Sequence, residues 1–392
     1  MENEKKIKVA LVRGDSLNVW EGGLWNDLPG INIVGFCARK NLYDVSGLEY
    51  PIQHLGASTD NIFTNNLNKF VSGIFQKMTG LEKRLVDFDI AHTVELSYYY
   101  TLQAVRAKKY NSRLKVVTTV WDNSFGRFEY NYWPGFSAPP SFWRKKMHEH
   151  INEAINGVDL LLPVSQMGVE MLLDLGVKEE KIQVLTPAIA VDKVDAISSV
   201  PFGLNGKELY FMVNRLVKEK GVYDVLYAWK MFRKEKFFPN KVLVIIGNGP
   251  EEKNMRRLVS EWGMGQSVVF IGSVPNSDLR TFYRQAKVLI LASMPNPLWQ
   301  EQFGYVLAEA ISQGCPVVST YSGAIPEVIE NAGLLFSPGN PIELKNCLIK
   351  LDSLPVYNEL RGNCERVKSK FAAGNFTKKL IGIYRNLLTD RT

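Results

Sequence analysis

The stretch EQFGYVLAEAISQGCPVVST, residues 301–320, contains two glutamates eight positions apart, Glu301 and Glu309. Gly314 suits a helix cap, so we expect a helix over 304–313. Glu301 then lies in the preceding loop, and Glu309 lies more than one turn along the helix. Carboxylates placed in this way would hold one elongated ligand at two points rather than act together on one bond. Two ordinary glutamates on a surface helix are the alternative.

The start of the expected helix is a candidate site for anionic or hydroxyl oxygens. The backbone amides of Phe303, Gly304 and Tyr305 have no partners within the helix, and the helix dipole adds to their attraction. Gly304 permits close approach of a ligand to the backbone. A sugar nucleotide has the required shape, with a hexose at one end and a ribose diol beyond the diphosphate.

A second candidate is the stretch MVNRLVKEKG, in which a strand ends at Val213 and a helix begins near Gly221. Arg215 and Lys220 lie in the connecting loop, close to helix amides that favour an anion. Together they suit a diphosphate, although two solvated loop cations would give the same pattern.

Two further motifs carry less weight. The turn GNGP, residues 247–250, either brings backbone close to a ligand or reverses the chain. It lacks the G-x-G-x-x-G fingerprint of dinucleotide-binding proteins, and it also lacks a GK[ST] phosphate loop. Asp87 and Asp89 form an Asp-x-Asp pair without companion metal ligands, so we interpret them as turn residues before a strand.

Short apolar runs alternate with amphipathic stretches along the chain, which is typical of parallel α/β units. Residues 191–207, which contain Pro201, Gly203 and Gly206, are expected to link two domains. Two doubly wound domains would place a cleft at the carboxyl ends of their strands. The expected strands are 8–12, 31–36, 89–94, 114–120 and 158–165 in the first domain, and 208–213, 241–247, 267–274, 288–293 and 316–320 in the second.

The bulk properties agree with a two-domain globular protein. A chain of 392 residues exceeds the roughly 250–300 residues at which single cores stop growing. No apolar run approaches the roughly 18–20 residues of a membrane span, and the start MENEKKIKVALV has no apolar signal-peptide core. Four cysteines show neither metal spacing nor a disulfide framework, so we expect a cytoplasmic protein.

The net charge of +7 fits a nucleic acid, an anionic membrane or anionic small substrates as partners. None of the known signatures of nucleic-acid-binding modules is present. We therefore expect no nucleic-acid partner.

Several stretches together resemble the carboxy-terminal half of family 4 retaining glycosyltransferases of the GT-B fold. They occur in the family's order, with the E-x7-E pair intact: MVNRLVKEKG, GNGPEE, VVFIGSVPNSDLRTFYRQAKVLILAS, WQEQFGYVLAEAISQGCPVVST and GAIPEVIENAGLLF. The resemblance implies an α/β protein in which two Rossmann-like, doubly wound domains face each other across a cleft. It also implies transfer of a hexose from a nucleoside diphosphate sugar with retention at the anomeric carbon.

The resemblance assigns roles to the matching positions. Arg215 and Lys220 would bind the donor diphosphate and stabilise it as it leaves. Glu301 would face the transferred sugar near its reacting carbon, and Glu309 would hydrogen-bond the ribose. The segment around Val274 would border the base.

The backbone at Phe303, Gly304 and Tyr305 would contact sugar hydroxyls or phosphate. Members of the family need no metal, because cations and helix ends stabilise the charge that a divalent ion stabilises elsewhere. The resemblance therefore implies a protein without metal or cofactor.

The resemblance is weaker in the amino-terminal half. Gly22 and Gly23 in EGGLW match a glycine-rich loop beside the diphosphate and acceptor. His92 matches a histidine at a strand end and is a catalytic candidate, with a structural histidine as the alternative. Trp121 stands where many members carry a histidine near the sugar, so Trp121 and Asp122 are candidates on the acceptor side.

Two segments bear on the acceptor. Residues 121–146 are rich in aromatic residues and end in a basic run, which suits a loop that contacts a sugar or a membrane interface. A packed connection is the alternative. The stretch 61–85 has apolar residues at helical spacing with basic residues between them, which predicts an amphipathic helix. Such a stripe usually packs in a core, but contact with the inner face of an anionic membrane is the alternative.

These patterns predict an acceptor-binding domain over 1–200, a nucleotide-sugar domain over 201–375, and a closing helix over 376–392 that returns to the first domain. The expected donor is a UDP- or GDP-sugar, and the expected acceptor is a glycan or a lipid-linked molecule. The alternatives are an epimerase or phosphorylase of the same fold, and a non-catalytic protein that binds sugar nucleotides or lipids. Trp121 favours the non-catalytic alternative.

Overall fold

The computed structural model divides into two compact units, which we describe separately. The first unit is Met1–Ala190 together with Ala373–Thr392, and the second is Val191–Ala372. The structure describes residues 6–60, 76–124, 141–189, 204, 206–235, 240–297 and 299–389.

The sheet of the first unit is parallel and has the strand order β3-β2-β1-β4-β5-β6. Its central strands are apolar on both faces, as expected for a sheet that helices cover on each side. The order reverses between β1 and β4, so the chain leaves these neighbours in opposite directions. The strands are β1 (Ile7–Gly14), β2 (Ile31–Ala38), β3 (Ile52–Leu55), β4 (Ile90–Val94), β5 (Lys115–Val120) and β6 (Leu160–Pro163).

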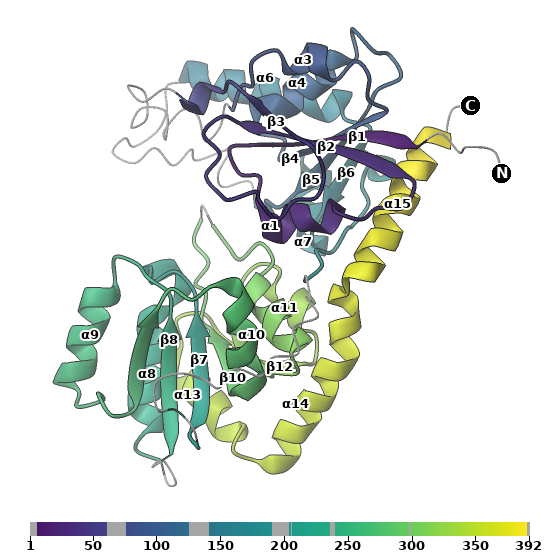
Figure 1. Ribbon diagram of the computed structural model, residues 1–392. Coiled ribbons are helices and arrows are strands. Elements are labelled where there is room, and N and C mark those ends of the chain that lie inside the picture. The colour runs from purple at the N-terminus through teal and green to yellow at the C-terminus, as the bar shows by residue number, and fades with distance from the viewer. Residues whose placement is uncertain are drawn as a thin grey trace. The chain divides into compact units, whose positions relative to one another are not determined.

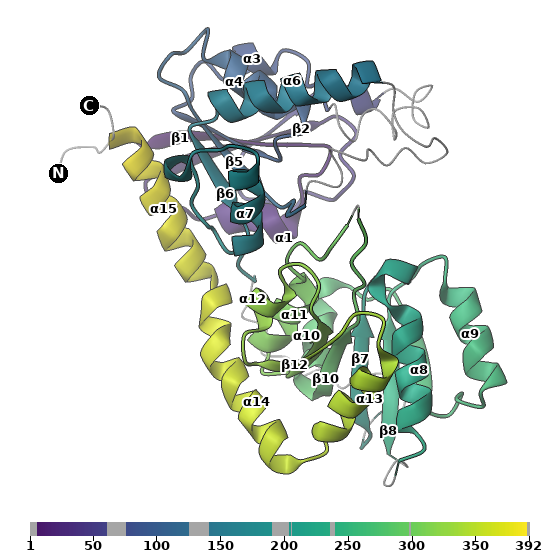
Figure 2. The ribbon, with the colours of Figure 1, turned by 180° about the vertical axis from the view of Figure 1, so that it is seen from behind.

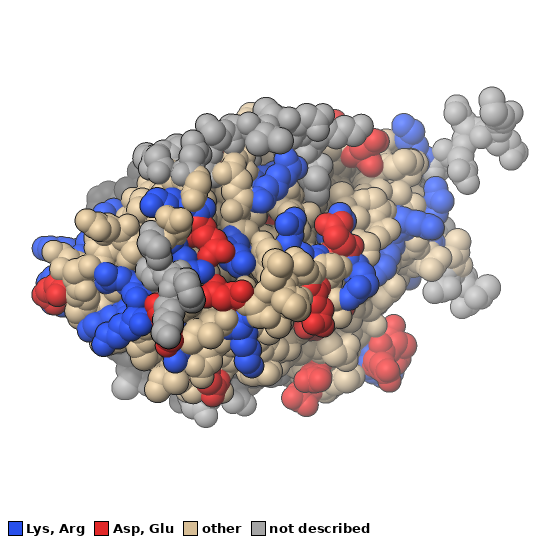
Figure 3. All heavy atoms as spheres, turned by 90° about the horizontal axis from the view of Figure 1, so that it is seen from below, with Lys and Arg blue, Asp and Glu red and all other residues tan. Residues whose placement is uncertain are grey.

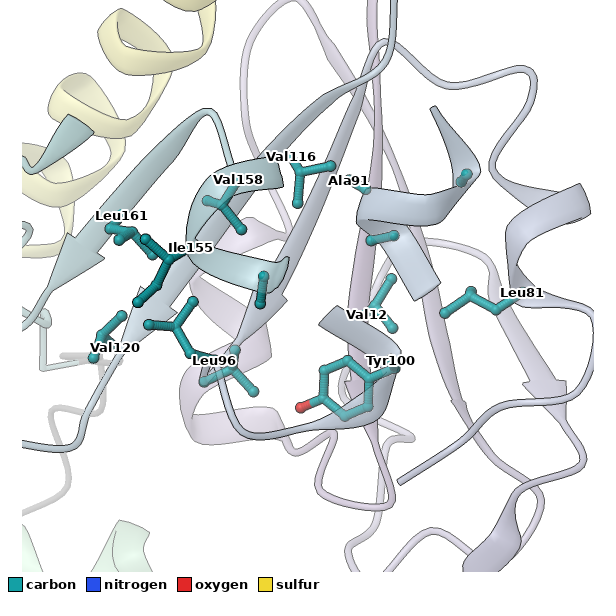
Figure 4. Packing of buried hydrophobic residues seen from close by; sticks show 14 of the residues in the cluster. Val12, Leu81, Ala91, Leu96, Tyr100, Val116, Val120, Ile155, Val158 and Leu161 are labelled. Carbon is teal, nitrogen blue, oxygen red and sulfur yellow. The ribbon is translucent and has the colours of Figure 1, made fainter. Parts of the chain in front are cut away.

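Helices cover both faces of this sheet (Figures 1 and 2). On one face, Leu81, Tyr100 and Ile155 from three different helices pack against Val12 and Val116 of the sheet (Figure 4). Burial of each such side chain contributes about 1.5–3 kcal/mol. The helices of the unit are α1 (Val19–Gly22), η1 (Gly23–Trp25), η2 (Ser58–Asp60), α3 (Leu81–Arg84), α4 (Tyr99–Ala107), α6 (Ser141–Gly157), α7 (Gln166–Asp174), η4 (Glu179–Lys181) and α15 (Ala373–Thr389).

The opposite face of the first sheet is covered by the end of the chain. Leu380 and Tyr384 of α15 pack with Trp25 of η1 against Val9 and Leu11 of β1. Residues separated by most of the sequence therefore share one core.

The second sheet is also parallel, with the order β12-β11-β10-β7-β8-β9. Its order reverses between β7 and β10, which are neighbours. Open α/β sheets bind ligands at the carboxyl ends of the strands where this reversal occurs. The strands are β7 (Glu208–Val213), β8 (Lys241–Ile246), β9 (Val268–Gly272), β10 (Ala286–Leu291), β11 (Val317–Thr320) and β12 (Gly333–Phe336).

The second sheet is likewise covered on both faces. Trp229 and Leu348, from two helices, pack with Tyr210 on one face, and Phe282 contacts Phe211 on the other with ring centroids 5.5 Å apart. The helices are η5 (Lys218–Lys220), α8 (Val222–Phe232), α9 (Glu252–Glu261), α10 (Asn276–Gln285), α11 (Tyr305–Ser312), α12 (Ile325–Ile329), α13 (Pro341–Lys350), α14 (Leu354–Val367) and η6 (Lys368–Phe371).

The helix expected over 61–85 is wrong for residues 76–80. Residues 76–80 are not helical, because Met78 forms an antiparallel bridge with Ala57, and α3 begins only at Leu81. Residues 61–75 lie outside the described residues, as do residues 125–140 of the aromatic segment.

Candidate active site

The loops that follow β7 and β10 bring Lys220 and Glu301 together, although they are 81 residues apart in the chain. Lys220 Nζ lies 2.6 Å from Glu301 Oε2, and the two side chains are 14% and 11% exposed. Ser293 Oγ donates a second hydrogen bond, of 2.7 Å, to the same carboxylate oxygen. The result is a largely buried ion pair at the point where the strand order reverses.

The backbone of Glu301 is fixed by the loop after β11. Ala324 N donates to Glu301 O over 2.9 Å, and Glu301 N donates to Ser322 Oγ over 3.4 Å. Gly323 between them has φ 55°, and a Cβ there would lie 1.9 Å from Glu301 O. This close contact requires glycine, so the carboxylate is held by a chain segment with little freedom to move.

The Lys220 loop is fixed in a similar way. Gly221 has φ 63°, and a Cβ there would lie 1.9 Å from Ala292 O in the segment after β10. Met294 N also donates to Glu219 O over 2.8 Å. The two loops of the switch point are therefore bonded to each other through backbone as well as through the ion pair.

Trp299 adds an aromatic contact to this site. Lys220 Nζ lies 4.5 Å from the centroid of the Trp299 ring, a distance that allows a cation–π interaction. Trp299 and Asn296 exchange backbone hydrogen bonds of 2.8 and 3.1 Å, which closes a tight turn in the chain before Glu301. Neither Trp299 nor Ser293 carried a signal in the sequence, because nothing in their spacing relates them to Lys220.

The helix expected over 304–313 is confirmed as α11, which begins after Gly304. Glu309 is half-buried on this helix, and its Oε2 accepts a hydrogen bond of 3.0 Å from the Tyr283 hydroxyl. Burial, together with the Glu309 charge, raises the pKa of Tyr283 well above its ordinary value. The phenol therefore stays protonated and donates the hydrogen bond to Glu309. Glu309 is thus held by α10, whereas Glu301 is held by loops.

The other predicted donor residues differ in their surroundings. Phe303 is buried, and its ring contacts those of Tyr305 and Phe371 with centroids 5.4 and 6.0 Å away, so only its backbone is available to a ligand. Arg215 is exposed in the loop after β7 and forms no ion pair with a described residue. Val274 is half-buried after the edge strand β9. The geometry therefore pairs Lys220 with Glu301, and the described contacts of that pair do not include Arg215 or Val274.

The GNGP turn packs against the backbone of the neighbouring loop. Leu216 N donates to Asn248 O over 2.9 Å, and Glu251 N donates to Leu216 O over 3.1 Å. The turn thus supports the loop that carries Arg215. Asp89, of the Asp-x-Asp pair, accepts a bond of 2.9 Å from Lys8 N at the start of β1.

In the first unit, His92 lies inside the core with no exposed surface. Its Nε2 is 2.8 Å from Thr119 Oγ1, and its Nδ1 is 2.5 Å from the Tyr384 hydroxyl of α15. Trp25 Nε1 donates to the same hydroxyl over 3.0 Å. Both ring nitrogens are therefore engaged within the unit, and neither remains for a substrate.

The buried state of His92 predicts a pH dependence of stability. Burial, with a smaller contribution from the Arg13 charge, holds its pKa well below the ordinary 6.5, and burial also lowers the pKa of His150. The native state keeps both rings neutral, whereas the unfolded chain binds protons below about pH 6.5. The free energy of unfolding should therefore fall by about 1.4 kcal/mol per pH unit for each such histidine as the pH drops below that value.

Urea denaturation between pH 7.5 and 5.0 checks this prediction. His92→Gln should reduce the slope of stability against pH, whereas His148→Gln, which changes an exposed histidine of α6, should leave it as in the unmodified protein. Equal slopes in the unmodified protein and in His92→Gln would contradict it.

The glycine-rich loop expected at Gly22 and Gly23 consists of short helical turns in the structure, and its place beside the diphosphate and acceptor stays a prediction. Gly22 ends α1 and Gly23 begins η1, so both lie in helical turns. A Cβ on Gly22 would lie 2.8 Å from the Tyr50 hydroxyl, which is the contact that favours glycine there.

The loops after β4 and β5 place Trp121 and Asp122 beside a glutamate that the sequence did not reveal. Glu95 is buried with φ 58°, and its Oε1 accepts bonds of 2.7 and 3.1 Å from the Trp121 and Asp122 amides. Trp121 also packs against the core of the unit. A non-glycine residue in this conformation is uncommon and marks strain that the structure holds in place. The one available signal was a charged residue directly after a buried strand.

A buried arginine occupies the same edge of the first sheet. Arg13, at the end of β1, donates from Nη1 to Val12 O and His92 O, each over 3.1 Å, and pairs with Glu21 over 3.2 Å. Its guanidinium lies 5.3 Å from the Trp25 ring centroid. Like Glu95, it lies at the carboxyl end of an apolar strand where the strand order reverses.

The described residues contain no helix with the length and apolar character of a membrane span. They also contain no group of three or more His, Cys, Asp or Glu side chains arranged to hold a metal ion. On the face drawn in Figure 3, basic and acidic side chains of the described residues are interspersed rather than gathered into one basic band.

Comparison with known proteins finds a family match within the second unit. Residues 197–368 match the family of glycosyl transferases group 1. An uncharacterised glycosyltransferase of Methanocaldococcus jannaschii is 27% identical over 183 residues, which are 46% of this chain and 45% of that protein. The alpha-monoglucosyldiacylglycerol synthase of Acholeplasma laidlawii is 25% identical over 187 residues, which are 47% of this chain and 45% of that protein. The chain thus spans less than half the length of these two curated relatives.

Among solved structures, the complex of HepE from Anabaena with UDP superimposes with a TM-score of 0.71 and 15% identity over 97% of this chain and 100% of that chain. This likeness shows the fold. The prediction of an α/β protein with the two doubly wound sheets of the GT-B fold is confirmed.

Proposed function

Because residues 197–368 form a glycosyl transferases group 1 domain and the resemblance to family 4-like GT-B glycosyltransferases is confirmed, we propose that the protein is a glycosyltransferase. The proposed reaction moves a hexose from a UDP- or GDP-sugar to a glycan or a lipid-linked acceptor, with retention at the anomeric carbon. The observation that carries the proposal is the Lys220–Glu301 pair at the strand-order switch point of the second sheet. The UDP-bound likeness and the glucolipid synthase among the relatives support this choice of donor and acceptor classes.

Departure of the diphosphate is the step in which charge develops. Lys220 and Arg215 would stabilise the leaving group, together with the amides at the start of α11. Lys220 is already positioned within a largely buried site, so its ammonium needs little rearrangement as the charge grows. Interactions that strengthen during bond cleavage lower the barrier rather than the ground state. We propose that these groups act without a metal or another cofactor.

The two glutamates would hold the two ends of the donor. Glu301, oriented by Ser293 and Ser322, would face the hexose. Glu309, oriented by Tyr283, would accept hydrogen bonds from the ribose hydroxyls. The amides between them would contact sugar or phosphate oxygens, and the segment around Val274 would border the base.

The acceptor would bind to the first unit. Trp121 and Asp122, whose amides are fixed by Glu95, are the proposed contacts there. A lipid-linked acceptor would bring the protein to the inner face of the membrane as a peripheral, cytoplasmic enzyme.

A panel of UDP-, GDP- and ADP-sugars tests the donor. The cognate donor should raise the melting temperature in proportion to the logarithm of its concentration above its dissociation constant, and it should be hydrolysed slowly without an acceptor. The same nucleotide should be released faster when the acceptor is present, and NMR of the product should show the donor's anomeric configuration. Stabilisation without any hydrolysis or transfer would favour a binding protein, and an inverted product would exclude retention.

Trp299→Leu should weaken donor binding by about twofold to thirtyfold, because a cation–π contact of about 0.5–2 kcal/mol helps to hold the Lys220 ammonium. Trp299→Phe keeps an aromatic face and should lose less. Isothermal titration with the cognate nucleoside diphosphate measures both, and Tyr321→Leu, at an exposed position, serves as the control. Equal affinity in Trp299→Leu and the control would show that the ring does not assist Lys220.

A further inference from the structure

A groove of about 470 Å³ lies on the first unit, at the amino-terminal end of its sheet. Its floor consists of Lys8 of β1, Asn32 and Val34 of β2, and Gln53 of β3. These residues lie near the starts of β1 and β2, whereas the candidate donor site belongs to the second unit and to the carboxyl ends of its strands. The groove is thus independent of the proposed transferase site.

The remaining wall comes from α3 and the segment that follows it. Lys83 and Arg84 end α3, and Asp87 and Phe88 lie just before β4. Phe88 is half-buried against the core, while Lys83, Arg84 and Asp87 are exposed. The groove is therefore open to solvent along α3 and closed by the sheet beneath.

The charges in the groove favour an anion. Three of its residues are basic and one is acidic, and Lys8, Lys83 and Arg84 form no ion pair with any described residue. Elsewhere in the same unit, the half-buried Arg106 and Lys108 are paired with carboxylates. Three cations against one carboxylate in a single hollow produce a net positive local potential that attracts an anionic ligand.

The groove also has features that a single bound ion would not require. Arg84 Nη1 donates to Gln53 Oε1 over 3.2 Å, which fixes the guanidinium and leaves its other N–H groups for a ligand. The amides of Asn32 and Gln53 supply hydrogen-bonding groups, and Val34 and Phe88 supply apolar surface. Its volume lies within the range of roughly 300–1,000 Å³ that is typical of small-molecule sites.

We propose that this groove binds the phosphate of a small organic phosphoester through Lys8, Lys83 and Arg84. The phosphate charge is matched by the cations, and the polar and apolar floor contacts the organic part. A phospholipid headgroup and a soluble sugar or polyol phosphate present this same chemistry. The inference goes beyond the proposed transferase activity, which uses other residues.

Binding is tested with glycerol 3-phosphate in solution and with vesicles of phosphatidylcholine that contain 30% phosphatidylglycerol. Isothermal titration should show about tenfold weaker binding of glycerol 3-phosphate to Lys83→Gln/Arg84→Gln than to the unmodified protein, because two charge-assisted contacts are lost from a partly screened site. Arg256→Gln/Arg257→Gln removes the same charge from exposed positions of α9 in the second unit and should bind within about twofold of the unmodified protein. Lys220→Ala should also retain binding, which separates the groove from the donor site.

The two probes distinguish the source of the phosphate. Sedimentation with vesicles that depends on Lys83 and Arg84 would support the groove as a headgroup site, and binding of glycerol 3-phosphate without such sedimentation would support it as a site for a soluble metabolite. Failure to bind either probe would overturn the proposal. Equal losses in the groove variant and the α9 control would overturn it as well, because binding would then follow net charge alone.

Discussion

Replacing Lys220 with alanine is expected to lower the turnover number for sugar transfer by about 10²- to 10³-fold, which is the usual effect of removing one preorganised group that stabilises developing charge. The ammonium is held by Glu301, the Trp299 ring and the Gly221 turn, so no other described cation occupies its position. Because its contribution grows as the diphosphate leaves, the turnover number should fall more than the donor affinity. Steady-state kinetics with the cognate donor and acceptor measure both quantities.

Lys218→Ala is the matched control, because Lys218 belongs to the same short helix η5 and is exposed. Its kinetics should stay within about threefold of those of the unmodified protein, as is usual for a surface substitution. Glu301→Gln keeps the size of the side chain but removes the charge that pairs with Lys220, and it should also lose most activity. Unchanged turnover in both Lys220→Ala and Glu301→Gln would refute the proposed chemistry of the pair.

Tyr384→Ala should destabilise the first unit by about 3–5 kcal/mol, the cost of removing a large aromatic side chain from a packed core. Tyr384 is fully buried and joins α15 to His92 and Trp25 through its hydroxyl. Tyr384→Phe retains the ring but leaves the two partners without that hydroxyl, which should cost about 1–3 kcal/mol.

Hydrogen exchange of peptides from β4 and α15 reports this loss locally, which matters because a chain of two units need not unfold in one step. Protection should fall in both peptides in Tyr384→Ala and remain unchanged in those of the second unit. Tyr110→Ala, at a position 55% exposed in the first unit, should change protection little. If β4 kept full protection in Tyr384→Ala, the helix would not contribute to the stability of that core.

Most of the fold can be predicted from the sequence, because a long buried strand appears as a continuous apolar run. All ten predicted strands are present, within a few residues of their expected ends. The two that were missed, β3 and β12, have four residues each and lie at sheet edges, where IQHL and GLLF are too short to show a period. The helix over 61–85 failed at Met78, since an apolar residue at helical spacing can equally fill a bridge beside Ala57.

The residues of the candidate site could be proposed from the sequence, but their geometry could not. Glu301, Glu309 and Lys220 follow from motif order, whereas the contact between Lys220 and Glu301 depends on β10 lying beside β7. Local sequence carries no information about that neighbour. His92 shows a second limit of prediction from sequence. The sequence around a polar residue at the end of a strand does not reveal whether its partner is a substrate or, as here, the hydroxyl of Tyr384.

The membership of α15 in the first unit has a consequence for biosynthesis. Residues 6–189 leave the ribosome long before Ala373–Thr389, which form α15. One face of the nascent first sheet therefore lacks α15 while the whole second unit is being translated. Val9, Leu11 and Trp25, which share a core with α15, lack that contact during the interval. The unit that is synthesised first is therefore the last to be completed, and nascent chains stalled before Tyr384 should depend on chaperones.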